Sequence, residues 1–216
     1  MVRPGCALAD IGTDHAYLPI WLAKQGMISR AIAADVRPGP LERAQQNIER
    51  YQVQHLVSAR LSDGLDAFQP SEAEDIVIAG MGGETMVQIL SRAPWLKNAE
   101  KHLILQPMTT VSTLRHYLAV QGFTVLREQA VQDEGRVYSA FLTVYRPDLA
   151  QEDALYLQIG KLKADTPDNR LYIRKRIEQL QKKASGLARS GKQAEAEPLL
   201  RLIEQLYSML EKDVAN

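Results

Sequence analysis

Short apolar runs alternate with amphipathic stretches through the first 150 residues of the chain. The runs are CALADI, RAIAADV, LVSARLSD, DIVIAGM and HLILQP, and each has the length of a buried strand. Between them, the pattern predicts helices near 19–26, 40–51, 84–90 and 110–120, with the RPGP cluster acting as a breaker before the second of these. This alternation predicts an α/β fold whose parallel sheet is covered on both faces.

The pattern changes after the fifth run. The segment FTVLREQAVQDEGRVYSAFLTVYRP is typical of two strands joined by a turn at Asp133 to Gly135, which is a hairpin and not a crossover unit. A mostly parallel sheet that ends in an antiparallel hairpin is the Rossmann-like arrangement of class I methyltransferases. That comparison is an analogy of fold and does not fix a function.

The β pattern stops at Pro147, and apolar residues then recur at helical spacing on both sides of the polar link ARSGKQAEAE. This spacing predicts a coiled-coil-like antiparallel helical pair that projects from the sheet domain. Simple helical packing against that domain is the alternative. We therefore expect a methyltransferase-type domain over residues 1–147 and a helical domain over residues 148–216. The residues that carry the helical spacing are Ile173, Ile177, Leu180, Ala184 and Leu187, then Leu199, Leu202, Leu206 and Met209.

Composition places the chain among soluble globular proteins, with 216 residues, 45% apolar and 24% charged. A single cysteine, Cys6, excludes an intramolecular disulfide and points to a reducing compartment. No signal segment and no apolar run of about 18 residues is present, so we expect a cytoplasmic protein without a membrane span. The net charge is zero, but residues 151–192 hold ten Lys and Arg against five Asp and Glu. This basic segment is either a solvated helix face or a phosphate-binding surface.

The residues that follow each apolar run are candidates for a ligand site, because ligands of open α/β sheets bind beyond the carboxyl ends of the strands. Four aspartates fall at the first three of these ends. They disfavour a pyrophosphate ligand, because a pyrophosphate site needs exposed backbone N–H groups and not carboxylates. The residues are Asp10, Gly12 and Asp14 after the first run, Asp35 after the second, Ser62, Asp63 and Gly64 after the third, Gly80, Met81, Gly82 and Gly83 after the fourth, and Gln106 and Pro107 after the fifth.

A cationic cofactor without phosphate suits such a rim. S-adenosylmethionine carries a sulfonium, an ammonium, a ribose diol and an adenine amino group, all of which a carboxylate can attract or accept from. Asp35 follows Asp10 by 25 residues, close to the spacing of an acidic residue that accepts ribose hydroxyls, and Asp63 falls where an adenine amino group would lie. Each aspartate alone is more typical of a turn or cap, and only their joint placement favours the cofactor.

The fourth strand end distinguishes kinds of methyltransferase. Enzymes that methylate exocyclic amino groups commonly have an Asp/Asn-Pro-Pro-aromatic motif there, whereas this chain has IAGMGGET. Glycines let a flat group approach the backbone closely, although a tight turn alone would also explain them.

The motifs DIGTDHAYLPI, IAGMGGETM and LILQPM, in this order and spacing, closely resemble the bacterial TrmK family, which methylates N1 of adenosine 22 in tRNA. The resemblance extends to the helical tail, which in the family helps to hold tRNA. It implies S-adenosylmethionine as cofactor, tRNA as partner, no metal and no obligatory protein partner. The implied cofactor contacts are Asp10, Gly12, His15, Asp35, Asp63, Gly64 and Gly80, and Asp14 is the implied catalytic residue.

We assign substrate contacts to two groups of residues. The first surrounds the target base and the second binds phosphates along the tail, where several cations share one helix face. For His15, the alternative to a role in the site is a purely structural role. For Tyr17, the alternative to stacking on the base is a position in the core or at the rim. The first group is Tyr17, Met81, Gly82, Gln106 and Pro107; the second is Arg170, Arg174, Lys175 and Lys182, with Lys161, Lys163 and Lys183 as further candidates.

For Asp14 we expect a hydrogen bond from the exocyclic amino group of adenine, which raises electron density at N1 and stabilises the developing cation. Proton abstraction after transfer is the alternative. Family members usually have a helix before the first strand, whereas nine residues precede Asp10 here. Either translation begins upstream or this segment is missing, and its absence would affect cofactor affinity and one wall of the tRNA cleft.

Three other functions fit parts of the sequence. A dehydrogenase on the same fold is disfavoured by the missing glycines, and a non-catalytic scaffold with a partner-binding tail would show no methyl transfer. A methyltransferase acting on another RNA base or a small molecule is the third, and a small-molecule substrate leaves the basic tail unexplained.

Overall fold

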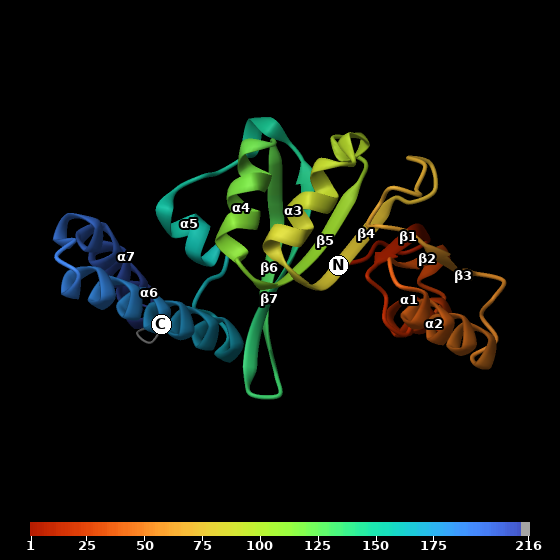
Figure 1. Cartoon of the computed structure of the whole chain (residues 1–216), viewed down its shortest axis with the longest axis horizontal. Coiled ribbons are helices and arrows are strands. Elements are labelled where there is room, and N and C mark those ends of the chain that lie inside the picture. Colours follow the sequence, from red (N-terminus) through yellow and green to blue (C-terminus); the bar gives the residue numbers. More distant parts are fainter. Residues whose placement is uncertain (213–216) are drawn as a thin grey trace. The chain divides into compact units, whose positions relative to one another are not determined.

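The computed structural model describes residues 1–212 and contains one seven-stranded sheet with strand order β3-β2-β1-β4-β5-β7-β6 (Figure 1). The first five strands pair in parallel, and β7 pairs antiparallel with β5. This confirms the mostly parallel sheet with an antiparallel hairpin. The strands are β1 (Cys6–Ile11), β2 (Ile28–Asp35), β3 (Val57–Leu61), β4 (Asp75–Gly82), β5 (His102–Thr109), β6 (Phe123–Asp133) and β7 (Arg136–Tyr145).

Four helices cover this sheet. Strand order reverses between β1 and β4, and right-handed crossovers then place the helices of the two halves on opposite faces. Accordingly α1 and α2 contact β1, β2 and β3, whereas α3 and α4 contact each other and β5 (Figure 1). The helices are α1 (Tyr17–Lys24), α2 (Pro38–Arg50), α3 (Gly83–Ser91) and α4 (Val111–Val120), with a short 3-10 turn at Pro94–Leu96.

The second helix begins two residues earlier than the sequence predicts. The RPGP cluster does not precede α2 but opens it, with Pro38 in the first turn. Proline fits this position because its fixed φ suits a helix and its missing N–H would have no partner there. The breaker interpretation of this cluster was therefore wrong.

The core lies along the centre of the sheet. All six residues of β1 are buried, which explains why this strand has no polar alternation except at its end. Leu8, Ile76, Ile78, Leu103 and Leu105 are fully enclosed between the helical layers.

At the amino ends of the strands, a buried carboxylate pairs with a half-buried arginine. Asp75 is completely buried and accepts hydrogen bonds from the backbone N–H and the Nε of Arg3, at 2.8 and 2.7 Å. This pairing compensates for the burial of the carboxylate. Burial, reinforced by the nearby Asp75, raises the pKa of the Cys6 thiol to about 12.

The hairpin turn adopts the expected geometry. Glu134 and Gly135 both have positive φ, as a two-residue hairpin loop of right-handed twist requires. The chain forms two compact units, and the hairpin is divided between them: residues 1–126 and 141–150 form the first, and residues 127–140 and those from 151 onward form the second. The boundary predicted at residue 147 stays a prediction.

The second unit contains residues 127–140 of the hairpin, here called the outer hairpin, and three helices. These are α5 (Ala154–Ile159), α6 (Pro167–Arg189) and α7 (Gln193–Lys212). Ala130 packs with Leu162 and Tyr172, and its backbone N–H donates to Asn169 Oδ1 at 2.9 Å. These contacts explain why residues of the hairpin group with the helical tail.

The helices α6 and α7 pack antiparallel along the predicted apolar residues. Ile173, Ile177 and Leu180 of α6 share a core cluster with residues of α7 that include Leu206. The link is shorter than predicted, because α7 begins at Gln193 and contains Pro198 in its interior. Among residues 1–212, no helix is both long and apolar enough to cross a membrane.

Candidate cofactor and substrate site

The loop between β1 and α1 is held against the second strand. The N–H groups of Gly12 and Thr13 both donate to the carbonyl oxygen of Ala34, at 2.8 and 2.9 Å. Gly12 has a φ of 78°, and Ala16 has a φ of 56°, which is uncommon for a residue with a side chain. The Thr13 hydroxyl accepts from the Ala16 N–H at 3.1 Å and stabilises this turn. Such left-handed backbone at a non-glycine residue is typical of functional sites.

Asp10 is a buried carboxyl at the end of β1. Burial raises its pKa to about 6, and a hydrogen bond with the Thr13 side chain lowers it in part. The charged form is therefore costly in the protein alone. A cation brought to this position would offset that cost.

Asp14 lies on the surface of the same loop, with 62% of its side chain exposed. His15 Nε2 lies 3.2 Å from Asp14 Oδ2, and Arg43 Nη1 lies 3.7 Å from Asp14 Oδ1. The His15 ring stacks on Tyr17, with centroids 5.1 Å apart and planes inclined by 18°. Asn47 Nδ2 donates to the His15 carbonyl at 3.0 Å and fixes the loop against α2. An exposed, oriented carboxylate beside two stacked rings suits recognition of a planar base.

Asp35 is buried at the end of β2. Its Oδ1 accepts from the backbone N–H of Arg37 at 2.8 Å, and its carbonyl oxygen accepts from the Ser62 N–H at 3.0 Å, which connects the second and third strand ends. Among residues 1–212, its Oδ2 has no hydrogen-bond partner. This oxygen is free to accept from a ribose hydroxyl.

Asp63 is exposed and already paired. Arg92 Nη1 donates to Asp63 Oδ2 at 2.9 Å, and Arg92 Nη2 lies 2.9 Å from Oδ1. The Arg92 hydrogen bond lowers the pKa of Asp63. A carboxylate has about four lone-pair sites, so this pairing leaves acceptor capacity for an amino group. The adjacent Gly64 has a φ of 58°, and a Cβ there would lie 2.8 Å from Ile89.

The fourth strand end is a turn fixed by its neighbours. Gln106 Oε1 accepts from the Gly80 N–H at 2.9 Å, and its amide nitrogen lies 3.4 Å from the Pro107 carbonyl oxygen. Gly80 has a φ of 76° and nothing within 4 Å of its Cβ position, so the surrounding space is open. The turn therefore satisfies the tight-turn interpretation and also leaves room for a flat group.

Two further glycine positions depend on close approach. A Cβ on Gly12 would lie 2.0 Å from Met81 Cε, so the Met81 side chain covers the first loop. A Cβ on Gly83 would lie 2.5 Å from the Thr110 carbonyl oxygen, which is backbone and cannot yield easily. Gly82 is less restricted, with Thr109 Oγ1 at 3.1 Å.

The cations predicted to bind tRNA differ in their surroundings. Arg170 is half-buried and donates to the carbonyl oxygens of Ala164 and Leu210, at 3.1 and 2.8 Å. Lys175 forms an exposed pair with Glu178 at 3.3 Å. The remaining candidates are exposed side chains on or before α6: Lys161, Lys163, Arg174, Lys182 and Lys183.

Sequence reasoning missed Arg43, Asn47 and Arg92, which position residues that it had identified. The spacing of Arg43 and Asn47 on one helix offers a weak signal, because both lie on the side of α2 that contacts the first loop. Arg92 follows Asp63 by 29 residues, and no local pattern connects them.

The residues at this rim fit S-adenosylmethionine. Gly80 leaves open backbone beside the fourth strand, whereas the Met81 side chain covers Gly12 beside the first. Asp35 offers a free carboxylate oxygen. The buried Asp10 suits the cationic part of the cofactor. Carboxylates and not phosphate-binding N–H groups dominate the rim, which agrees with a cofactor that lacks phosphate.

This fold and rim define a methyltransferase. Residues 1–141 match the family model described as a methyltransferase domain. The chain is 28% identical to the tRNA (adenine(22)-N(1))-methyltransferase of Bacillus subtilis over 96% of its own length and 88% of the relative. It is 30% identical to Sp1610 of Streptococcus pneumoniae, whose crystal structure is described as that of a candidate tRNA (m1A22) methyltransferase. That alignment covers 98% of this chain and 95% of the other, with a TM-score of 0.85. The chain belongs to the tRNA (adenine(22)-N1)-methyltransferase family.

The same S. pneumoniae protein has been solved in complex with S-adenosyl-L-methionine, and that structure has a TM-score of 0.81 to this chain. The crystal structure of the B. subtilis enzyme, at 24% identity and a TM-score of 0.84, shows the same fold.

The burial of Asp10 leads to a prediction that links stability to binding. A raised carboxyl pKa means that the stability contribution of Asp10 is full below pH 4 and is lost as the pH rises to about 6. Asp10→Asn avoids the buried charge, so we expect it to stabilise the free protein at pH 8 by about 2 to 3 kcal/mol. It should also weaken S-adenosylmethionine binding at least tenfold, because the carboxylate is lost. Urea unfolding at pH 4 and pH 8, with calorimetric titration of the cofactor, measures both effects.

The control is Asp66→Asn, which removes an exposed carboxylate that lies 3.3 Å from Arg92 Nε. It should change neither quantity appreciably. An Asp10→Asn protein that unfolds at the same urea concentration at pH 8 as the unaltered protein would contradict the proposed cost of burial.

Proposed function

We propose that this protein transfers the methyl group of S-adenosylmethionine to N1 of adenosine 22 in tRNA. The observation that carries the proposal is the alignment with the B. subtilis enzyme, which extends over 96% of the chain and includes the helical tail. The exposed Asp14 beside His15 and Tyr17 agrees with it, because a carboxylate next to two stacked rings suits a planar base. We place the reaction in the cytoplasm.

The cofactor would be held by the rim residues. Asp35 would accept from the ribose hydroxyls, Asp63 from the adenine amino group, and Asp10 would balance the positive charge. Gly12, Gly64 and Gly80 would contact the cofactor through their backbones, with open space beside Gly80, and His15 would complete the contacts. When bound, S-adenosylmethionine supplies a methyl group on a positively charged sulfur.

The task of the protein is then mainly to orient the adenine. The N1 lone pair of neutral adenine needs no deprotonation, so the base has to be held in line with the methyl carbon. Asp14 would accept a hydrogen bond from the exocyclic amino group and stabilise the positive charge that develops on the ring. The His15 and Arg43 contacts hold this carboxylate in position. The surrounding contacts would come from Tyr17, Met81, Gly82, Gln106 and Pro107.

The target adenine has to leave its stack to reach this site, which costs a few kcal/mol. Contacts with tRNA phosphates would offset that cost. We assign these contacts to the exposed cations of α6, in a helical domain that spans residues 148–216, with residues 1–147 as the cofactor-binding domain.

One experiment tests the proposal. The protein is incubated with labelled S-adenosylmethionine and unmodified tRNA, and the methyl group is mapped by reverse transcription, which stops at N1-methyladenosine. We expect a single stop at position 22. The matched substrate is the same tRNA with guanosine at position 22, which should take up no label. Label at another position, or no label with a tRNA that binds, would refute the proposed function.

A further inference from the structure

One side of α1 exposes two large aromatic rings. The helix buries Pro19, Ile20, Leu22 and Ala23 against the sheet, as an amphipathic helix should. Yet Tyr17 is 60% exposed and Trp21 is 56% exposed. They are four residues apart, and Lys24 follows three residues later, so all three lie on one ridge. This ridge covers about 10 Å of helix length.

The neighbouring side of α2 is basic. Arg43, Asn47 and Arg50 are spaced at four and three residues and therefore share the side that contacts the first loop. The acidic residues of this helix occupy a different side, where Glu49 accepts from Gln45 at 3.0 Å. The helix thus separates its positive and negative side chains.

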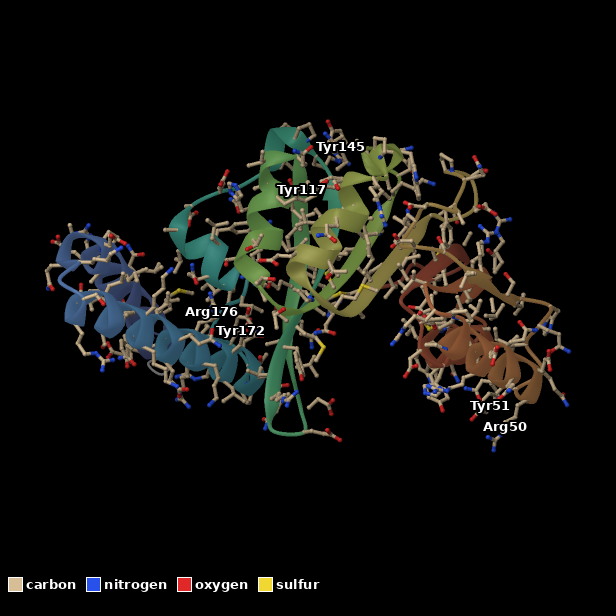
Figure 2. All side chains as sticks on the ribbon, viewed as in Figure 1. Arg50, Tyr51, Tyr117, Tyr145, Tyr172 and Arg176 are labelled. Carbon is tan, nitrogen blue, oxygen red and sulfur yellow. The ribbon has the colours of Figure 1, made fainter. Side chains whose placement is uncertain are left out.

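The two helices meet at Tyr51. Lys24 Nζ lies 5.2 Å and Arg50 Cζ lies 5.9 Å from the centre of its ring. Figure 2 shows Tyr51 and Arg50 at the end of α2, with the Arg50 side chain directed away from the ribbon. Among the residues that the structure describes, neither Lys24 nor Arg50 forms an ion pair with a carboxylate. Both charges therefore remain available to an anionic partner.

This surface is continuous with the candidate substrate site. Tyr17 stacks on His15, and Arg43 lies beside Asp14, so the ridge begins where the target base is proposed to lie. Exposed aromatic rings alternating with unpaired cations are typical of surfaces that bind unpaired nucleic acid, since the rings stack on bases and the cations neutralise phosphates. A protein partner would not require this separation of charge.

We propose that the surface formed by Trp21, Lys24, Arg50 and Tyr51, here called the α1–α2 surface, binds the tRNA strand that adjoins the target adenosine. Trp21 stacks on an unpaired base, and Lys24 and Arg50 contact phosphates. The proposal rests on the proposed function for the identity of the RNA. It adds an RNA contact in the sheet domain, next to the target-base site, to the phosphate contact assigned to the tail.

The two tryptophans of the chain give a direct test. Trp95→Phe leaves Trp21 as the only tryptophan, and Trp21→Phe leaves the half-buried Trp95, which lies under Lys101. We expect unmodified tRNA to quench the emission of Trp21 and to protect it from acrylamide. The emission of Trp95 should not respond. A response of Trp95 alone, or of neither residue when tRNA is bound, would overturn the proposal.

Affinity provides the second measurement. Trp21→Ala should raise the Kd for tRNA about tenfold. The double variant Lys24→Gln, Arg50→Gln should reduce the slope of log Kd against log salt by about 1.4, because each phosphate contact with an unpaired strand contributes about 0.7. The matched control is Arg30→Gln, Lys97→Gln, which removes two other exposed cations of the same unit and should keep the slope of the unaltered protein.

These outcomes separate the two proposals. If the unaltered protein methylates adenosine 22 and the double variant keeps its salt slope, the α1–α2 surface is refuted and the function stands. If tRNA protects Trp21 but no methyl group is transferred, the function is refuted and the surface stands. If sedimentation shows a dimer that Trp21→Ala dissociates without loss of tRNA affinity, the surface binds a second copy of the chain and the proposal is overturned.

Discussion

Asp14→Asn should lower kcat for tRNA methylation by about a hundredfold or more, with little change in the affinity for S-adenosylmethionine. The amide is nearly the same size as the carboxylate and can still accept a hydrogen bond, but it carries no charge to stabilise the cationic ring in the transition state. Loss of one preorganised electrostatic contact typically costs this much. Single-turnover methylation with saturating tRNA measures the effect, because it separates the chemical step from product release.

The control is again Asp66→Asn, an exposed carboxylate that contacts Arg92 and has no proposed catalytic role. The pH profile distinguishes the two mechanisms considered for Asp14. If Asp14 acts as a hydrogen-bond acceptor, the residual activity of Asp14→Asn should have the same pH profile as the unaltered protein. If Asp14 acts as a base, its loss should change that profile. Turnover near that of the unaltered protein would refute the assigned role.

Removing three cations from α6 should weaken tRNA binding on the order of a hundredfold at physiological salt. The variant carries Arg174→Gln, Lys175→Gln and Lys182→Gln, all exposed positions. If each cation contacts one phosphate, the slope of log Kd against log salt should fall by about 2.7. Filter binding at several salt concentrations measures both quantities, and S-adenosylmethionine affinity should remain unchanged.

A control of opposite sign is available on the same helix. Glu178 pairs with Lys175 at 3.3 Å, so Glu178→Gln should release that lysine and tighten tRNA binding slightly. Point changes are preferable to deletion of residues 151–216. Deletion would remove Leu162 and Tyr172 from the outer hairpin and expose Ala130. An unchanged salt slope in the triple variant would assign the tail a role other than phosphate binding.

The strands and their succession along the chain could be predicted from the sequence, because buried parallel strands are short and continuously apolar. All five predicted runs became strands, and the turn at Glu134 and Gly135 lies where its residues require it. The helix boundaries were harder to predict from the sequence. The Pro and Gly residues around Pro38 predicted a break before the helix, but Pro38 begins α2. Similarly, α7 begins within the segment predicted as a polar link.

Charged residues at strand ends could be identified, but their partners could not. The local sequence pattern identifies Asp14 and Asp63 as candidate site residues, because each follows an apolar run. Their contacts with Arg43 and Arg92 depend on which helices pack beside them, and that information is not local. Burial also has to be observed: Asp10 and Asp63 are similar in sequence terms, yet the pKa of Asp10 is raised and that of Asp63 is lowered.

The lone thiol offers a use beyond the site. Cys6 is enclosed at the start of β1, an interior strand of the sheet, and burial raises its pKa to about 12, so the folded protein holds almost no thiolate at neutral pH. A reagent such as an alkylating maleimide can then modify it only when β1 opens. The labelling rate therefore follows the opening of the sheet in real time, and the unaltered chain needs no added probe to compare its kinetic stability with and without cofactor.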